Sequence, residues 1–242
     1  MNIIVKKTCD STNKEVFRQT KLLKKQEAFA ILCEAQTKGR GNGKNVWYAE
    51  PGKNLTCSLV YFPLFLDAYR QFYFSIIIAL SIDDLLKNYH LKSAVKWPND
   101  ILVNEKKIAG LLIESEIQQG KVICIVAGIG LNINQTTFSD EIKHPTSLAL
   151  EGVKNQTPES VLYELIEMVD IWYKELKNNA FATIKSTYLD RLTGYQTWKM
   201  YKSNKNIFKG KIVDVCEDGK AIIQSENGKI HQFDIKEVEL LI

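Results

Sequence analysis

Four short segments of the 242-residue chain concentrate polar, basic or glycine residues at the ends of apolar runs. They are residues 11–13 (STN), 36–41 (QTKGRG), 96–110 (KWPNDILVNEKKIAG) and 128–134 (GIGLNIN). The second opens a long loop, residues 37–54, which is rich in glycine and basic residues and is here called the flap. Such a loop is usually either functional or disordered. Glycines let backbone approach an anion closely and fixed cations balance its charge, so we expect an anionic ligand.

Taken singly, each segment also has a purely structural explanation. STN before a helix is typical of an N-cap, and a Gly-x-Gly in a strand can simply ease packing. Lys106 and Lys107 can be solvated turn residues. The WPND sequence is less ordinary, because Pro98 forces an extended Trp97 and the following Asn-Asp favours a turn.

Composition excludes several classes of protein. The chain is 45% hydrophobic and 25% charged, as a globular protein with a full core is, and its net charge of +4 is too small to indicate nucleic acid. The N-terminus has only a three-residue apolar run, and the longest apolar stretch, residues 72–82, is shorter than the ~20 residues of a membrane span. Five cysteines form no CxxC pair, which indicates buried, reduced thiols. We expect a soluble, cytoplasmic protein without a membrane or nucleic-acid partner.

The apolar patterns predict a mixed α/β body followed by a smaller β module. Strands are expected at residues 2–8, 27–36, 55–63, 93–97, 101–103, 108–117 and 121–133, and helices at 10–23, 67–89, 157–178 and 181–192. Thr12 and Glu15 have capping-box spacing at the start of the first helix. Short turns between the strands of 93–133 indicate antiparallel pairing, and the almost wholly apolar 122–131 indicates a central strand covered on both faces.

Beyond Gly194 the sequence changes to short strands separated by turns at SNKN, EDGK and ENGK. Asp-Gly at 218–219 and Asn-Gly at 227–228 are strong hairpin signals. We therefore expect two domains, a body at 1–194 and a C-terminal module of about five strands at 195–242.

In this order, STNKE, AQTKGRG followed by Trp47, KWPNDILVNEKKIAGLLIE and GIGLNIN resemble the biotin–protein ligases (biotin–[acetyl-CoA-carboxylase] ligases). The likeness covers residues 8–150 in motif detail and the C-terminal module more loosely. The chain is similar to the monofunctional form, without an N-terminal DNA-binding domain. The implied fold is α+β, with a largely antiparallel mixed sheet flanked by helices, as in class II synthetases, and a small C-terminal SH3-like barrel.

The resemblance implies an AMP-forming ligase with biotin and ATP as substrates and Mg²⁺ accompanying the nucleotide. Such an enzyme activates biotin as biotinyl-5'-AMP and transfers it to a lysine of a biotin carboxyl carrier domain. Fixed cations must balance the charge that accumulates at phosphorus. The family motif places its catalytic lysine directly before the Ile-Ala-Gly strand, which selects Lys107 over Lys106, and Arg40 is the second expected catalytic cation. No metal site formed by the protein itself is expected.

A biotin pocket should be apolar with a few placed polar groups. By resemblance, biotin would be bound by Ser11, Thr12, Asn13, Gln36, Arg40, Gly41, Asn42, Lys107, Gly110 and Gly128, with Ala109 and Leu112 as further walls. The nucleotide would be contacted by Arg40, Trp47, Asn132 and Asp100. Trp47 would close over the ligand or stack on adenine, or else merely anchor the loop. Asp100 would orient a lysine or the acceptor amine, or else cap a turn. The flap would order over the ligand and exclude water.

Many family members have GRGRRGR where this chain has GRGNGKN, so Asn42, Gly43 and Lys44 depart from the pattern while Arg40 is kept. Weaker retention of the adenylate is the hypothesis that follows. A lipoate–protein ligase and a non-catalytic biotin-binding sensor are the alternatives. The quaternary structure is left open between a monomer and a homodimer formed through a sheet edge.

Overall fold

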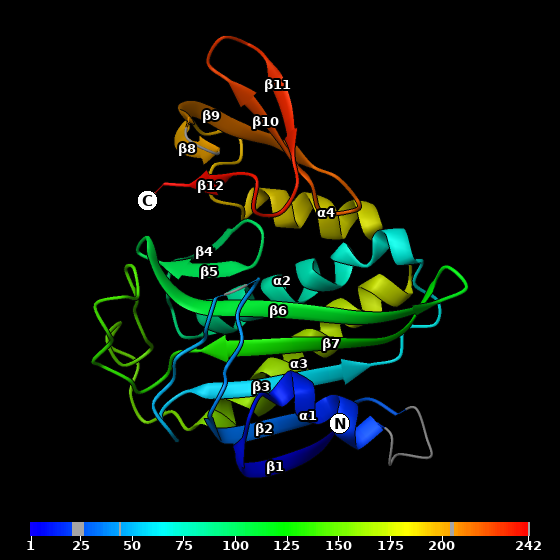
Figure 1. Ribbon diagram of the computed structural model, residues 1–242, viewed down its shortest axis with the longest axis vertical. Coiled ribbons are helices and arrows are strands. Elements are labelled where there is room, and N and C mark those ends of the chain that lie inside the picture. The colour runs from blue at the N-terminus through cyan, green and yellow to red at the C-terminus, as the bar shows by residue number, and fades with distance from the viewer. Residues whose placement is uncertain (21–26, 44, 204–205, 242) are drawn as a thin grey trace.

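The computed structural model describes residues 1–20, 27–43, 45–203 and 206–241. A seven-stranded sheet of order β1-β2-β3-β7-β6-β5-β4 forms the body, and a five-stranded antiparallel sheet of order β11-β10-β9-β8-β12 lies at the C-terminal end (Figure 1). This architecture confirms the predicted α+β fold.

Each element of the body has the following bounds. The strands are β1 (Asn2–Cys9), β2 (Phe29–Gln36), β3 (Leu55–Tyr61), β4 (Ser93–Lys96), β5 (Asp100–Val103), β6 (Lys106–Gln118) and β7 (Lys121–Leu131). The helices are α1 (Thr12–Thr20), the short 3-10 helix η1 (Ala68–Arg70), α2 (Phe72–Asn88), α3 (Pro158–Lys177) and α4 (Phe181–Asp190).

The sequence correctly predicts the antiparallel half of the sheet. Strands β4, β5, β6 and β7 follow one another as antiparallel neighbours, and β7 lies at the centre of the seven strands. Its side chains pack alternately into two cores, because helices cover both faces of the sheet.

The N-terminal part of the body differs from the prediction in one strand pairing and at the start of helix α1. Strands β1 and β2 are parallel neighbours connected through α1, a pairing that the sequence did not predict. Helix α1 begins at Thr12, so this residue is not its N-cap; both its backbone N–H and its hydroxyl donate to Gln36 Oε1, at 2.8 and 3.3 Å. The predicted helix position Leu23 lies outside the described residues.

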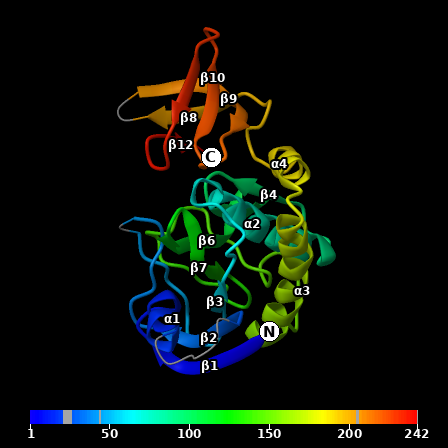
Figure 2. The same ribbon diagram turned by 90° about the vertical axis from the view of Figure 1, so that its right-hand side faces the viewer.

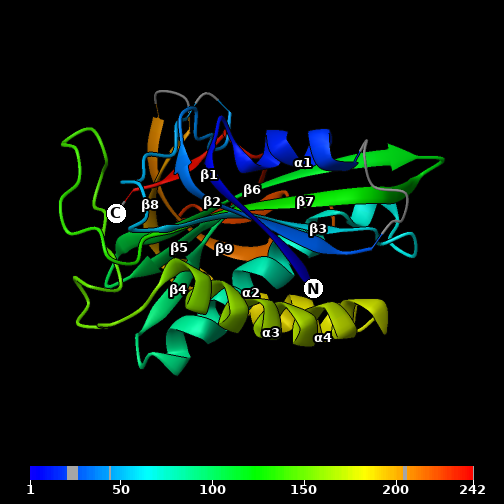
Figure 3. The same ribbon diagram turned by 90° about the horizontal axis from the view of Figure 1, so that it is seen from below.

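Two apolar layers enclose the large sheet. Helices α2, α3 and α4 lie on one side and α1 on the other (Figure 3). The larger core joins the sheet to α2 and α3, and a smaller one under α1 contains Val16, Phe29, Ile31, Val60, Cys124 and Val126. The α1 layer covers only part of its face of the sheet, because α1 is short.

The C-terminal module contains β8 (Lys199–Ser203), β9 (Asn206–Val215), β10 (Ala221–Ser225), β11 (Ile230–Phe233) and β12 (Glu239–Leu240). Its sheet stands beyond α4 and β4 (Figure 2). The predicted Asp-Gly and Asn-Gly turns connect β9 to β10 and β10 to β11, with φ of 94° at Gly219 and 83° at Gly228. The predicted SNKN turn includes residues 204–205, which lie outside the described residues. Apolar residues of this module belong to the same core as those of the body, and the domain boundary at 194 stays a prediction.

Candidate active site

The sheet topology brings the four polar segments to one end of the sheet. Parallel β1 and β2 both end there, with Cys9 paired to Gln36. Strand β7 ends beside the start of β3, with Leu55 paired to Leu131, and Ala109 near the start of β6 pairs with the same leucine. The segments that follow or precede these strand ends therefore surround one space.

Glycines in β7 open this space on the face of the sheet that α1 covers elsewhere. Cys124 and Val126 fill the core under α1, and the next two residues on that face are Gly128 and Gly130. A Cβ atom on Gly128 would collide with the Asn13 carboxamide, and one on Gly130 would collide with the Trp47 indole. The two glycines thus leave the floor free for neighbouring side chains and a ligand.

A β-bulge decides which side chains of β6 face the cavity. The register between β5 and β6 shifts so that Ile101 pairs with Ala109 while Leu102 pairs with Lys107. The bulge places Lys107 on the same face as Gly110, whose Cβ would lie 3.3 Å from the Lys107 Nζ. Ala109, predicted as a pocket wall, is buried in the main core, because it precedes Gly110 by one residue and so lies on the opposite face of β6.

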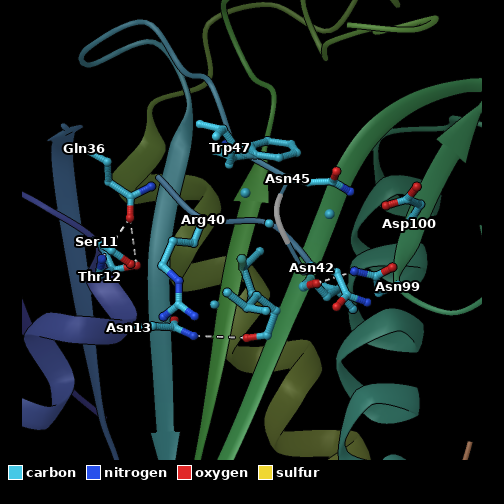
Figure 4. A pocket seen from close by; sticks show the side chains of 18 of the residues that line it. Ser11, Thr12, Asn13, Gln36, Arg40, Asn42, Asn45, Trp47, Asn99 and Asp100 are labelled. Atoms are coloured by element: carbon cyan, nitrogen blue, oxygen red, sulfur yellow. Dashed lines mark hydrogen bonds between the residues drawn. The ribbon is translucent and has the colours of Figure 1, made fainter. Parts of the chain in front are cut away.

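A single cavity of about 120 Å³ receives almost the whole predicted site. The predicted residues that line it are Ser11, Thr12, Asn13, Gln36, Arg40, Gly41, Asn42, Trp47, Asp100, Lys107, Gly110, Leu112 and Gly128. In Figure 4 the labelled side chains, among them Asn13, Gln36, Arg40, Trp47 and Asp100, converge from α1, β2, the flap and β5. Lys106 is exposed and does not line this cavity, whereas Lys107 does.

One end of the cavity holds a buried hydrogen-bond network. Asn13 donates to the Leu112 carbonyl at 3.2 Å and to Glu114 Oε2 at 2.8 Å, and its Oδ1 accepts from the Ser58 hydroxyl at 2.6 Å. Gln36 accepts from Thr12, as Figure 4 shows. The network fixes the orientation of these amide groups at the cavity wall.

Two cations lie on the cavity wall, each beside a carboxylate. Arg40 Nη1 is 3.1 Å from Glu114 Oε1, and Lys107 Nζ is 2.6 Å from Asp100 Oδ1. The Lys107 ammonium also lies 5.7 Å from the centroid of the Trp47 ring. The flap and the start of β6 therefore meet at one cavity and supply it with positive charge.

The described part of the flap has local structure of its own. Arg40 and Val46 form an isolated antiparallel bridge, Gly41 N–H donates to the Asn45 carbonyl at 2.8 Å, and Trp47 N–H donates to Gly39 at 3.2 Å. These bonds turn Trp47 over the glycines of the floor. Lys44, the third departure from the family pattern, lies outside the described residues.

Asn132 lies behind Trp47 and lines a smaller cavity together with it and Lys107. It is buried, and its amide donates to the Thr146 carbonyl at 2.9 Å. Thr146 N–H in turn donates to the Lys107 carbonyl at 2.9 Å. Asn132 therefore supports the backbone that carries Lys107, and its contact with a nucleotide stays a prediction.

The site continues into a larger depression of about 730 Å³ between the flap, β4, β5 and the C-terminal strand β12. Asp100 and Lys107 line both spaces, and Lys96 and Lys143 add positive charge to the larger one. Burial lowers the pKa of Lys96. The larger space offers room for a second substrate next to Lys107, and its wall also carries the carboxylates of Asp100, Glu105, Glu141 and Glu239.

The family model of the Biotin/lipoate A/B protein ligase family matches residues 5–132, just over half of the chain. The chain belongs to this family. A biotin–[acetyl-CoA-carboxylase] ligase of Paracoccus denitrificans is 30% identical over 189 residues, which cover 75% of this chain and 77% of that protein. The bifunctional ligase/repressor BirA of Bacillus spizizenii is 27% identical, and the match covers 87% of this chain but 66% of that protein's length, slightly less than two thirds. The biotin protein ligase from Aquifex aeolicus, solved in complex with biotin and ATP, superimposes with a TM-score of 0.79 at 26% identity, covering 99% of this chain and 98% of the other.

Sequence reasoning missed four polar residues of this biotin/lipoate ligase family site: Asn45 and Asn99, which line the cavity, and Glu114 and Ser58, which bond to lining residues. Glu114 bonds both Arg40 and Asn13, and Ser58 holds Asn13 from β3. Alternation from Gly110 along β6 was the available signal for Glu114, since positions 110, 112 and 114 share a face. Nothing in the sequence around Ser58 distinguishes it from an ordinary strand residue.

The cysteines, possible metal ligands and helix lengths bear on further expectations from the sequence. Four of the five cysteines are buried and all are free, and burial raises the pKa of Cys124 to about 11, so its thiol stays protonated. Within the described ranges, no group of three or more His, Cys, Asp or Glu residues is arranged to hold a metal ion. None of the helices in the described part of the chain is long and apolar enough to span a membrane.

Proposed function

We propose that this protein is an ATP-dependent biotin–protein ligase. The observation that carries the proposal is the meeting of Arg40 and Lys107 across one glycine-floored cavity, in a chain of the biotin/lipoate ligase family. These two cations lie 67 positions apart in the sequence. Because they line the same cavity, both can contact one substrate bound there.

In the first step, a carboxylate oxygen of biotin attacks the α-phosphorus of ATP. A new carbon–oxygen–phosphorus linkage forms, the bond between the α-phosphorus and the bridging oxygen breaks, and pyrophosphate leaves with its electron pair. Negative charge builds up around phosphorus, and Arg40 and Lys107 are proposed to stabilise it. The glycines of the flap let backbone N–H groups approach the same phosphate.

In the second step, the neutral amine of an acceptor lysine attacks the biotinyl carbonyl carbon. The amide bond forms, AMP leaves, and the amine loses one proton. We propose that Asp100 orients this amine or Lys107, with which it is paired at 2.6 Å. The acceptor would be the biotin carboxyl carrier domain of a biotin-dependent carboxylase, approaching through the larger depression.

The two spaces suit the two substrates. The smaller cavity, with Ser11, Thr12, Asn13 and Gln36 at its polar end, would bind the biotin head group, and the larger one would accept the nucleotide phosphates. Mg²⁺ is commonly held by substrate phosphates with one or two carboxylates, so we propose that it arrives with ATP.

Entry of biotin would require the flap to move. The cavity of about 120 Å³ is smaller than the roughly 300–1,000 Å³ of sites for drug-sized ligands. Trp47 covers the glycine floor at Gly110 and Gly130. We propose that the flap opens for the ligand and closes over the adenylate, which excludes water from a hydrolysable anhydride.

A lipoate–protein ligase is the nearest alternative, since the family model includes both activities. The named relatives that the chain resembles are biotin ligases, which favours biotin. The alternative of a non-catalytic biotin sensor is disfavoured by the two cations at the cavity.

Incubation with biotin, ATP, Mg²⁺ and an acceptor carrier domain, followed by intact mass spectrometry, tests the proposal. We expect one biotinyl adduct on the acceptor and pyrophosphate release that depends on biotin. Biotin binding without pyrophosphate release would identify a sensor, and equal labelling with lipoate would identify the alternative ligase.

A further inference from the structure

The turn between β9 and β10 of the C-terminal module touches the body next to the active site. The buried indole N–H of Trp97 donates to the Gly219 carbonyl at 2.8 Å, across 122 positions of sequence. Gly219 has φ of 94°, a conformation that favours glycine, and its Cβ would lie 2.6 Å from the Phe72 ring. No side chain fits at this position without displacing the turn.

Trp97 begins the turn that carries two residues of the cavity wall. Asn99 is held on the other side of this turn, because its amide donates to the Leu111 carbonyl at 2.6 Å and its own carbonyl accepts from Leu111 N–H at 2.9 Å. Asp100 follows, and its carboxylate pairs with Lys107. The turn is thus fixed between β6 and the C-terminal module, and the position of the Asp100–Lys107 pair depends on both attachments.

The hydrogen bond is one of several contacts that attach the module to the body. Lys185 of α4 pairs with Asp214 at 2.8 Å, and Arg70 pairs with Glu217 at 3.3 Å. Apolar residues of both parts also share one core. Because these contacts also attach the module, the Trp97–Gly219 bond, which reaches the turn beside the reacting groups, is suited to positioning.

We propose that Gly219 and Trp97 are positioning residues for the ligase reaction. Through them the C-terminal module holds the Trp97–Asp100 turn, and so orients Lys107 toward the phosphorus. Neither residue touches substrate. This inference rests on the proposed function and adds to it a defined role for the C-terminal module in the chemical step.

The geometry predicts which kinetic constant responds. The polar end of the biotin cavity is formed from α1 and β2, by Thr12, Asn13 and Gln36, and none of these residues bonds to the Trp97–Asp100 turn. Loosening the turn therefore changes the alignment of Lys107 and leaves the biotin head contacts in place. We expect kcat for adenylate formation to fall while KM for biotin stays unchanged.

The test compares Trp97→Phe, which removes the indole N–H but keeps an aromatic ring, with Lys185→Met, which breaks a different contact between the module and the body, the ion pair with Asp214. A small misalignment of a catalytic group costs about 10- to 100-fold in rate, and this is the loss in kcat expected for Trp97→Phe. Lys185→Met should change kcat and KM by no more than about twofold. Hydrogen–deuterium exchange of Trp97→Phe should rise in peptides spanning 97–111, where Leu111 N–H is bonded to Asn99.

Gly219→Ala perturbs the Trp97–Gly219 contact at its acceptor residue. This variant tests the inference where Trp97→Phe fails to fold. The same loss of kcat at constant KM is expected, because the new methyl group pushes the turn away from Phe72. Wild-type kcat in either folded variant, or a loss shared equally by Lys185→Met, overturns the inference. An unaltered protein that releases no pyrophosphate with biotin would instead overturn the proposed function, so the two failures are distinguishable.

Discussion

Replacing Lys107 with methionine removes the ammonium that we place at the reacting phosphorus while retaining an unbranched side chain. The stem can still pack near Trp47, over whose ring the ammonium lies at 5.7 Å. Lys106→Met is the matched control, because this neighbour carries the same charge, is exposed and does not line the cavity.

The expected loss follows from the electrostatics of a fixed cation. Two unit charges about 4 Å apart interact by about 4 kcal/mol at an effective dielectric constant of about 20. Removing one preorganised donor from a developing negative charge typically costs about 2.7–4 kcal/mol, or roughly 100- to 1,000-fold in rate. We expect a loss of this size in the rate of adenylate formation by Lys107→Met.

Stability should change far less than rate. The Lys107 and Asp100 side chains are 34% and 23% exposed, so solvent screens their ion pair. Such pairs contribute about 1 kcal/mol or less to the free energy of unfolding. A large fall in activity with little change in the urea midpoint would separate catalysis from folding.

Single-turnover formation of biotinyl-adenylate, measured with saturating biotin and ATP, is the appropriate assay. Lys106→Met should stay within about twofold of the unaltered protein, as for exposed positions in general. Equal losses in the two variants, or a loss below about tenfold in Lys107→Met, would refute the assignment of Lys107.

Three further predictions test other parts of the site. Gly128→Ala should weaken biotin binding at least about tenfold in calorimetry, because the added methyl group displaces the buried Asn13; unchanged affinity would contradict the described floor. Asn42→Arg should slow the release of free biotinyl-adenylate, and release from the unaltered protein that is no faster than from this variant would reject the retention hypothesis. The hydrogen bond from the Gln19 amide, together with those from Arg18 and Lys6, holds the pKa of Glu15 below its ordinary value. The ionised carboxylate therefore stabilises the folded state at pH values above 4.5, the ordinary pKa. This stabilisation is lost as the pH falls through the lower pKa that Glu15 has in the folded state. Glu15→Gln should then lower the unfolding free energy at pH 7, and its difference from the unaltered protein should shrink as the pH is lowered below 4.5; a difference that stays constant with pH would contradict the linkage.

Much of the fold is predictable because local patterns and short turns determine it. The apolar run of β7 indicates a central strand, and the Asp-Gly and Asn-Gly turns indicate the C-terminal hairpins, as observed. The parallel pairing of β1 with β2 was not predictable in this way, since it depends on how α1 crosses between them. Loop length alone does not specify that crossing.

The site shows the same division between local and long-range information. The order of the motifs predicts Arg40 and Lys107 as the two catalytic cations. The structure places both at one cavity. The face of Lys107 depends on a one-residue bulge, which alternation cannot reveal. The bond between Trp97 and Gly219 joins residues 122 positions apart, and neither residue's sequence context indicates the other.

The central claim is that the flap cation and the β6 lysine serve one cavity in which a carboxylic acid is joined to a nucleotide. Exchange of labelled pyrophosphate into ATP, measured without any acceptor, tests it most directly. We predict exchange that requires biotin and is lost in both Arg40→Gly and Lys107→Met. Exchange that proceeds without biotin, or that survives in both variants, would contradict the account.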